Sequence, residues 1–507
     1  MTTRRFLDAA KFFGTLAALL LVAACGGEPQ PTAAPGTAPA EPAAKSEAPA
    51  PVLDIPDSAV AQAALAPWKG DLDGMIERRI IRVLTTYSKT QFFIDRGMQR
   101  GLVPDAFKIL EDDLNKKLKA KHLRVQVVIV PVAHDDLVPA LLEGRGDIVA
   151  AGKVMTAWRK NDVDFTNPTR TGISTIVVTG PGVPTLATAQ DLAGREVYLR
   201  ASDVSGDAVK RFNAALAAAG KPPVRVKPAP EVLADEDLLE MVSAGMVPQT
   251  IVDDYVAEFW QKIFPGLVLN SGAAVRTDAS TAMMVRKGSP KLLAELNDYL
   301  ARYPEGSLTR NVLFQKYLKN VQYAKAATSG ADLERFRNVV ALMKKYGDQY
   351  DMDYLLMAAQ GYQESGLDHG RKSQVGAIGV MQVMPKTGAD LKVGDIRQLE
   401  PNINAGIKYM RFMIDRYYAD EPMDDLNKGL FAFASYNAGP ARIRGLREKA
   451  AQRGLDPNKW FNNVEVVASE SIGRETVQYV ANIYKYYLAY QMASEQMQQR
   501  DAAKAAQ

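Results

Sequence analysis

The sequence predicts a multidomain fold in which an α/β region precedes a region that is almost entirely helical. Three observations support this prediction. Residues 71–325 alternate between short apolar strands and amphipathic helices, residues 326–495 show helical periodicity alone, and residues 25–70 are rich in proline and alanine. At about 150 residues per domain, the 507 residues leave room for two to four domains.

The composition is that of a globular protein and excludes several classes. Apolar residues make up 47% of the chain and charged residues 24%, which excludes wholesale disorder and a multi-span membrane protein. The 62 basic and 58 acidic residues leave a net charge of +4, so charge gives no reason to expect a nucleic-acid partner. One cysteine and three histidines without metal-motif spacing exclude a disulfide and a thiolate zinc site, and we expect no metal or cofactor.

Residues 1–24 are predicted to be an export signal. Arg4 and Arg5 precede an apolar stretch of about 13 residues, which is too short to span a bilayer but suits a signal peptide. Small residues then lead into Cys25, and this end resembles a bacterial lipobox, which implies a diacylglyceryl group on the Cys25 thiol. Gly26 in place of an aspartate favours the outer membrane, with the protein lipid-anchored and facing the periplasm. An ordinary signal peptide with a chance cysteine is the alternative.

Residues 25–70 are predicted to be a tether that starts at the lipidated cysteine. Seven prolines lie between Pro29 and Pro51, with almost no large apolar residue among them. Such a segment buries too little surface to offset its ordering entropy. At about 3.1 Å per residue, the proline-rich stretch from Gly26 to Val52 alone reaches roughly 80 Å when extended, which is a plausible span from a membrane into the periplasm.

Residues 71–325 begin with a βαβαβ pattern, which predicts a parallel sheet with helices on its faces. Strands are expected at 80–84, 125–130 and 146–150, and helices at 104–117 and around Leu137 to Leu142. A second unit begins near Asp191, and its expected elements are strands at 250–254 and 282–285 and a helix at 290–300.

Three segments of this region, 146–152, 155–159 and 163–168, resemble family-3 periplasmic solute-binding domains over about 240 residues. The resemblance implies a two-lobed, periplasmic-binding-protein-like fold with a small solute or a muropeptide as ligand. It also implies that Arg159 grips a ligand carboxylate and that Asp253 holds an amino group, since a guanidinium fork suits a carboxylate. A structural ion pair or a solvated face is the alternative for both residues.

The chain departs from the amino-acid-binding members of that family at neighbouring positions. Gly152 and Val154 stand where small hydroxyl donors are common, and Val103 stands where an acid is common. Amino-acid binding is therefore not a firm expectation for this region, which we interpret as a regulatory or targeting module.

In residues 326–495, one helix is marked at both ends. Asp353 suits the N-cap of a helix that runs to Glu364, and Gly366 suits its C-terminal cap. Leu355 belongs to the buried stripe, whereas Glu364 lies about half a turn away from it. Gly361 has no side chain and leaves space beside this carboxylate. A partly apolar setting raises the pKa of a glutamate toward neutrality, as a general acid requires.

Four blocks, at 364–385, 402–406, 435–439 and 475–480, resemble in this order the catalytic domain of soluble-type lytic transglycosylases, which is lysozyme-like. The match covers about 150 residues. It implies a protein that cleaves peptidoglycan strands, with Glu364 as catalytic acid and base and Tyr479 orienting it. It also implies a saccharide groove lined by Ser373, Met381, Gln382, Tyr436 and Asn437.

The expected chemistry needs a single carboxylate. Retaining and inverting hydrolases need a second one at a set separation, and the four blocks supply no obvious candidate. The resemblance implies that Glu364 protonates the leaving oxygen and then accepts a proton from the C6 hydroxyl of N-acetylmuramic acid, giving a 1,6-anhydro sugar. Two alternatives stay open: a solute receptor whose C-terminal domain only binds glycan, and a muramidase-type hydrolase. Residues 496–507 are expected to be a flexible tail.

Overall fold

The structure is a computed structural model that describes residues 66–156, 158–323 and 330–506. The predicted signal peptide, Cys25 and the tether up to residue 65 lie outside the described residues. The described residues all belong to one compact unit, residues 52–507. Within these described ranges, no helix combines the length and the apolar character needed to cross a bilayer.

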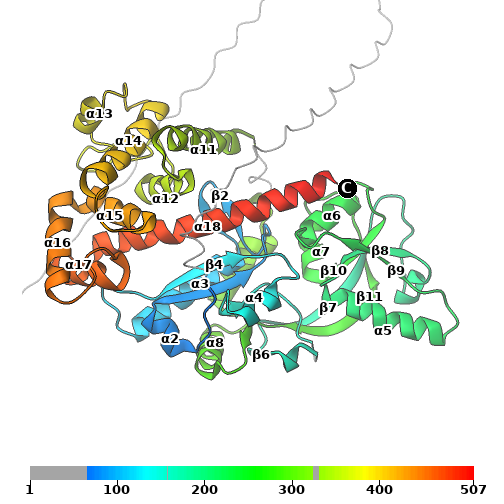
Figure 1. Ribbon diagram of the computed structural model, residues 1–507. Coiled ribbons are helices and arrows are strands. Elements are labelled where there is room, and N and C mark those ends of the chain that lie inside the picture. Colours follow the sequence, from blue (N-terminus) through cyan, green and yellow to red (C-terminus); the bar gives the residue numbers. More distant parts are fainter. Residues whose placement is uncertain (1–65, 157, 324–329, 507) are drawn as a thin grey trace, which may run out of the picture. The chain divides into compact units, whose positions relative to one another are not determined.

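The first sheet has the strand order β4-β1-β5-β12-β6 (Figure 1). Its first three strands run parallel, which confirms the predicted βαβαβ unit. Strand β12, which returns from far along the chain, runs antiparallel to both of its neighbours, β5 and β6. The sheet is therefore mixed rather than wholly parallel. The strands are β1 (Ile80–Thr85), β4 (Gln126–Pro131), β5 (Ile148–Val149), β6 (Val163–Phe165) and β12 (Met284–Arg286).

Helices and a small hairpin complete this first part. Helix α3 starts within two residues of its predicted start and ends where predicted, because its stripe of Phe107, Leu110 and Leu114 is buried against the sheet. The elements are α2 (Leu72–Glu77), α3 (Leu102–Lys117), α4 (Leu137–Glu143) and α8 (Pro290–Arg302), with the hairpin β2 (Phe93–Asp95) and β3 (Met98–Arg100).

A second set of strands forms the other lobe. Its central strand, β7, lies between β10 and β11 in an antiparallel sheet, and β8 pairs in parallel with β9. The chain passes from the first sheet to the second after β6 and returns after β11, as a two-lobed fold requires. The elements are β7 (Arg170–Thr179), β8 (Glu196–Arg200), β9 (Arg225–Ala229), β10 (Gln249–Asp253), β11 (Val268–Thr281), η1 (Trp158–Asn161), η2 (Ala189–Leu192), α5 (Val204–Ala218), α6 (Asp235–Ser243) and α7 (Asp254–Gln261).

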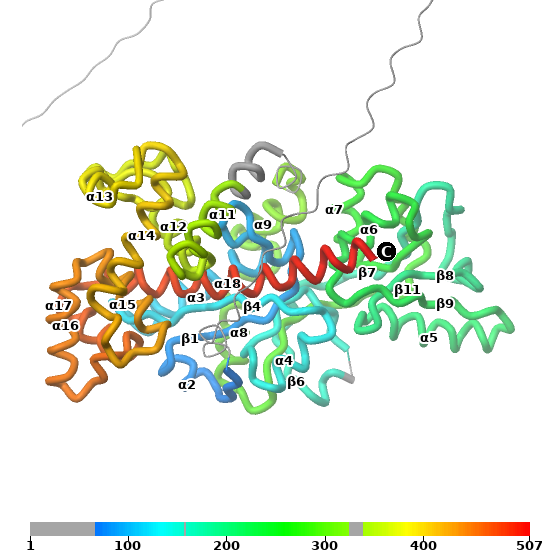
Figure 2. Tube along the Cα trace, turned by 45° about the horizontal axis from the view of Figure 1, so that its top comes forward, coloured from blue at the N-terminus to red at the C-terminus, as the bar shows by residue number. Residues whose placement is uncertain are grey.

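The remaining chain is helical, as predicted. After α9 (Leu308–Phe314) and η3 (Gln315–Lys319), the helices are α11 (Gly330–Tyr350), α12 (Tyr354–Ser365), α13 (Pro385–Leu391), α14 (Leu399–Tyr417), α15 (Asp425–Ala438), α16 (Pro440–Gln452), η4 (Trp460–Val464), α17 (Glu465–Ser471) and α18 (Arg474–Ala505). Helix α18 contacts α12, α15 and α17, and it also contacts β4 of the first sheet (Figure 2). It therefore connects the helical region to the α/β region.

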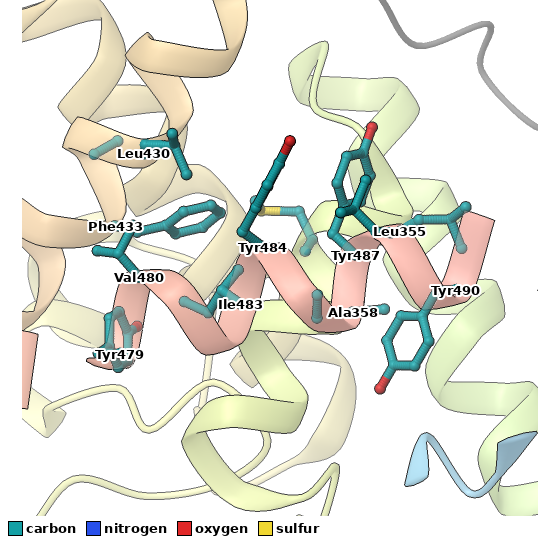
Figure 3. Close-up of a cluster of buried hydrophobic side chains, with 14 of the residues drawn as sticks. Leu355, Ala358, Leu430, Phe433, Tyr479, Val480, Ile483, Tyr484, Tyr487 and Tyr490 are labelled. Atoms are coloured by element: carbon teal, nitrogen blue, oxygen red, sulfur yellow. The ribbon is translucent and has the colours of Figure 1, made fainter. Parts of the chain in front are cut away.

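Buried aromatic side chains fix α18 against its helical neighbours. Figure 3 shows Phe433 of α15 and Leu355 of α12 close to the apolar side chains of α18. Tyr484, Tyr487 and Tyr490 are all buried. Tyr490 points to the opposite side of α18 from the other two (Figure 3), and its hydroxyl donates to the Gly97 carbonyl between β2 and β3 at 2.6 Å.

The prediction of a flexible tail at 496–507 is wrong for residues 496–505, which are the last turns of α18. Arg500 is buried, and its Nε and one terminal nitrogen donate to the Asp237 carboxylate at 2.7 and 2.6 Å. The Lys504 ammonium donates to Glu240 at 2.8 Å. The segment lacks aromatic residues, but these ion pairs with α6 hold it in place, because two positive side chains meet the acidic face of that helix.

Candidate active site

Helix α12 places Glu364 in its last turn. The Asp353 Oδ1 atom accepts from the Leu355 N–H at 2.9 Å, and Gly366 follows the helix with a φ of +70°. Both predicted caps are thus confirmed. Asp353 has a further task, because its Oδ2 accepts from the hydroxyl of Tyr487 on α18 at 2.5 Å. The start of α12 is thereby tied to the helix that carries Tyr479.

Glu364 and Tyr479 are hydrogen-bonded. The Tyr479 hydroxyl donates to Glu364 Oε1 at 2.5 Å. Burial raises the pKa of Glu364 to about 7, while the bond from Tyr479 and the nearby Arg371 guanidinium oppose that rise. Burial is the largest effect, as expected for a carboxyl that loses water on one side. The result is a carboxyl that holds and releases a proton near neutral pH.

Two further side chains support this pair. Gln360 lies one turn before Glu364 and has no exposed surface, and its Nε2 approaches the Tyr479 hydroxyl at 3.4 Å. The half-buried Tyr436 donates from its hydroxyl to the Met381 carbonyl at 2.7 Å, and burial, followed by the Glu364 charge, raises its pKa. The sequence interpretation missed Gln360, although its position four residues before Glu364 puts both on one helix face.

The loop after α12 is shaped by its own backbone bonds. The Ser373 hydroxyl accepts from the Ala377 N–H at 2.9 Å. Gln382 adopts a φ of +46°, and its Nε2 donates to the Gly379 carbonyl at 2.8 Å. Both predicted groove residues keep partial exposure. Their placement as saccharide contacts stays a prediction.

Met381 lies elsewhere than predicted. Its side chain has no exposed surface, so it belongs to the core rather than to a groove wall. A methyl group added at Gly406 would lie 2.5 Å from the Met381 Cβ, which shows how closely this side chain packs against α14. The contribution of Met381 near the site comes from its carbonyl, which holds Tyr436. An apolar, unbranched side chain fills such a core gap readily.

Asn402 fastens the same loop from beneath. It is fully buried, accepts from the Met381 N–H at 3.0 Å and donates to the Ile378 carbonyl at 2.9 Å. Gly379 has a φ of +78°, and a Cβ there would lie 2.5 Å from Asn402. This glycine is therefore required both for the turn and for the close approach.

Asn437 is the second-last residue of α15, which ends at Ala438, and it is exposed. Its Oδ1 accepts from the Thr476 hydroxyl at 2.6 Å, which links the third block to the fourth. It caps no helix, because the N-cap of α16 is Gly439. Asn437 therefore remains available for the predicted saccharide contact.

A cavity of about 50 Å³, called here the solute cavity, lies beside the end of β10. Asp253 lines it, and its Oδ1 accepts from the Thr175 hydroxyl at 2.9 Å. Burial raises the pKa of Asp253 to about 7, against the lowering effect of that hydrogen bond. Lys153 and Arg276 line the same cavity, so it presents both signs of charge.

Arg159 does not line the solute cavity as it stands. It lies buried in η1, where burial lowers its pKa and the acids Asp203 and Asp207 counteract that effect. The structure thus places Asp253, but not Arg159, at the cavity. Within residues 66–156, 158–323 and 330–506, no group of three or more histidine, cysteine, aspartate or glutamate side chains is arranged to hold a metal ion.

Two family models match the chain, and they define its class. Residues 341–460 match the transglycosylase SLT domain, and residues 82–320 match bacterial extracellular solute-binding proteins, family 3. The chain therefore joins a solute-binding domain to a transglycosylase domain that contains Glu364. In this order of domains it is similar to membrane-bound lytic murein transglycosylase F.

Two curated relatives carry that name. The protein from Desulfosudis oleivorans is 27% identical over 429 residues, which cover 80% of this chain and 89% of the relative. The protein from Pseudomonas fluorescens is 27% identical over 438 residues, covering 82% and 85%.

Among solved structures, a mutant of the arginine-binding protein ArgBP from T. maritima is 21% identical with a TM-score of 0.40, covering 49% of this chain and 99% of that one. The ancestral amino acid-binding protein AncCDT-1 is 25% identical with the same score and the same coverage.

Proposed function

We propose that this protein is a lytic murein transglycosylase that cleaves the β-1,4 bond between N-acetylmuramic acid and N-acetylglucosamine in peptidoglycan. The observation that carries the proposal is the state of Glu364. Its pKa lies at about 7, and the Tyr479 hydroxyl donates to it at 2.5 Å. A carboxyl that is protonated near neutral pH can act as the general acid that breaking a glycosidic bond requires.

The proposed reaction uses Glu364 twice. The protonated carboxyl donates its proton to the glycosidic oxygen as the bond from that oxygen to C1 breaks. The resulting carboxylate then accepts the proton of the C6 hydroxyl, whose oxygen forms the new bond to C1. The product is a 1,6-anhydro sugar, no water is consumed, and Glu364 regains its starting state. A pKa near the working pH serves both steps.

Product analysis tests the reaction. Purified peptidoglycan is incubated with the full chain or with Glu364→Gln, and the soluble products are identified by mass spectrometry. We expect anhydro-muramyl products from the wild type alone. Reducing-end products would identify a hydrolase instead. If neither protein cleaved peptidoglycan, a receptor whose helical domain only binds glycan would be favoured.

The solute cavity supports a regulatory or targeting role for residues 71–325, next to a catalytic domain at 326–495. Asp253 together with Lys153 and Arg276 suits a small solute or a muropeptide that carries both charges. Calorimetry with a panel of amino acids and soluble muropeptides tests this role, with Asp253→Asn as the variant. A ligand can shift only a state that it binds differentially, so unchanged peptidoglycan cleavage with and without bound ligand would contradict regulation.

An anchor at Cys25 is also part of the proposal. The relatives are named membrane-bound, and the lipobox-like end of the predicted signal peptide supplies a residue for lipidation. Several acyl chains on one cysteine suffice for stable anchoring. Labelling with a fatty-acid analogue and separation of inner and outer membranes should find the label in the outer membrane. Cys25→Ser should abolish both label and membrane retention.

A further inference from the structure

A second cavity, of about 140 Å³, has no part in the proposed reaction or in the solute cavity. We call it the α18 cavity. It lies where the first turns of α18 approach the first sheet. Its walls come from the segments leading into β1 and β4, from η4 and α17, and from α18 (lining residues include Arg78, His122, Arg124, Phe461, Ala481 and Lys485).

The α18 cavity lies in a region of excess positive charge. Four arginine and lysine side chains line it, whereas Glu465 is the one carboxylate among its lining residues. The four basic residues are Arg78, Arg79, Arg124 and Lys485. Their ion-pair partners are Asp147, Glu465, Asp112 and Glu111, in that order. A cavity in this setting attracts an anion.

Two buried nitrogen atoms at this cavity lack hydrogen-bond partners. They are Nε of Arg78 and Nδ1 of His122. Arg78 is held in place by Asp147 at 2.5 Å and by the Trp68 ring, whose centroid lies 3.8 Å from its guanidinium carbon. Buried polar atoms normally have partners. A guanidinium that is fixed in this way and lines the cavity is suited to an oxyanion.

Most of the remaining lining surface is apolar, although Gln126, Asn462, Glu465 and Gln478 also line the cavity. Val128, Phe461, Val477 and Tyr484 contribute carbon surface. An engineered cavity of about 150 Å³ lined by apolar side chains takes up benzene, so this volume matches one aromatic ring or a short branched aliphatic group. Inorganic phosphate leaves such carbon surface without a partner.

We propose that the α18 cavity binds a small organic monocarboxylate whose compact apolar body lies against Phe461 and Val128 and whose carboxylate faces Arg78, His122 and Arg124. This proposal does not depend on the reaction catalysed at Glu364.

Calorimetry with benzoate as the probe tests the proposal on the full chain in a nonionic detergent. We expect one site with a Kd of about 1 mM or tighter at low salt. Benzamide has the same shape without the charge, and we expect it to bind at least ~10-fold more weakly, because a paired charge gives a stronger hydrogen bond than a neutral group. Inorganic phosphate should also bind at least ~10-fold more weakly.

Variants locate the site. Arg124→Gln breaks only the ion pair with the exposed Asp112, so we expect the protein to stay folded. Because the variant loses a positive charge that faces the ligand, it should bind benzoate at least ~5-fold more weakly. Ala481→Leu fills the cavity from α18 and should abolish binding. The matched control is Arg145→Gln, which also removes a paired arginine but lies outside the cavity and should bind benzoate normally.

Three results would overturn the proposal. They are the absence of benzoate binding, equal binding of benzamide or phosphate, and benzoate binding that survives both Arg124→Gln and Ala481→Leu. The last result would place the bound benzoate elsewhere, for example in the solute cavity. Thermal unfolding of each variant keeps a loss of binding distinct from a loss of fold.

Discussion

The carboxyl groups of Glu364 and Asp253 share a pKa of about 7 but lie in different surroundings. In both cases burial raises the pKa and a hydroxyl donor opposes the rise, Tyr479 for Glu364 and Thr175 for Asp253. Glu364 has one nearby cation and no carboxylate among its influences. Asp253 is influenced by two further acids and by Lys153. The same pKa therefore suits proton transfer at one site and recognition of charge at the other.

Neutralising each carboxyl should separate the two roles most strongly. Glu364→Gln should lower the rate of anhydro-product release by about 10³-fold or more, since it removes the proton donor and acceptor. Asp253→Asn, measured without any added solute, should change that rate less than about 2-fold. Initial rates on purified peptidoglycan check both. A large loss in Asp253→Asn would mean that the solute cavity takes part in the reaction itself.

Removing the hydroxyl donor at Glu364, the proposed catalytic carboxyl, should have the next largest effect. The bond from Tyr479 lowers the pKa of Glu364, so Tyr479→Phe should raise it above 7. The basic limb of the pH–rate profile should then move to higher pH, and the maximal rate should fall roughly 10-fold because the carboxyl loses its orientation. Tyr484→Phe, on the same helix, is the control. A lower rate with an unmoved pH profile would contradict an electrostatic role.

Local signals predicted the helix that carries Glu364. Asp353 and Gly366 mark the ends of α12 because capping depends on neighbouring residues alone. The four blocks then identified Tyr479 by resemblance. Gln360 escaped notice because its partner is 119 residues away. Met381 was misplaced, since a motif position does not reveal whether a side chain points into the core.

The α/β region shows the same limit on a larger scale. The parallel βαβαβ unit follows from consecutive elements, and the sequence predicted it. The antiparallel sheet around β7 escaped prediction, because its pairs join strands that lie far apart in the chain. The order of residues 496–505 depends on Arg500 meeting Asp237, 263 residues away. The composition of residues 496–505 predicts a solvated tail, because it does not reveal this distant partner.

The pH dependence of the free energy of unfolding should show that the pKa of both carboxyls is raised in the folded protein. An acid with a raised pKa in the folded state binds more protons folded than unfolded between about pH 4 and 7, so the free energy of unfolding decreases as pH rises through that window. Glu364→Gln and Asp253→Asn should therefore each stabilise the protein at pH 8, by on the order of 1–2 kcal/mol, and by less than about half of that at pH 5. Urea denaturation at both pH values measures this. Equal effects at both pH values would mean that neither pKa is raised.

The smallest expected effect comes from the hydroxyl donor at Asp253. Thr175→Val keeps the shape of this buried side chain and removes the bond to Oδ1. The bond favours the ionised form, so its loss should destabilise the protein by about 1 kcal/mol at pH 8 and by less than half of that at pH 5. Urea denaturation of the wild type, of Thr175→Val, of Asp253→Asn and of the double variant gives a double-mutant cycle. If the pH dependence persists in the double variant, it arises from another group, and the likeness between the two carboxyls would then extend only to their burial.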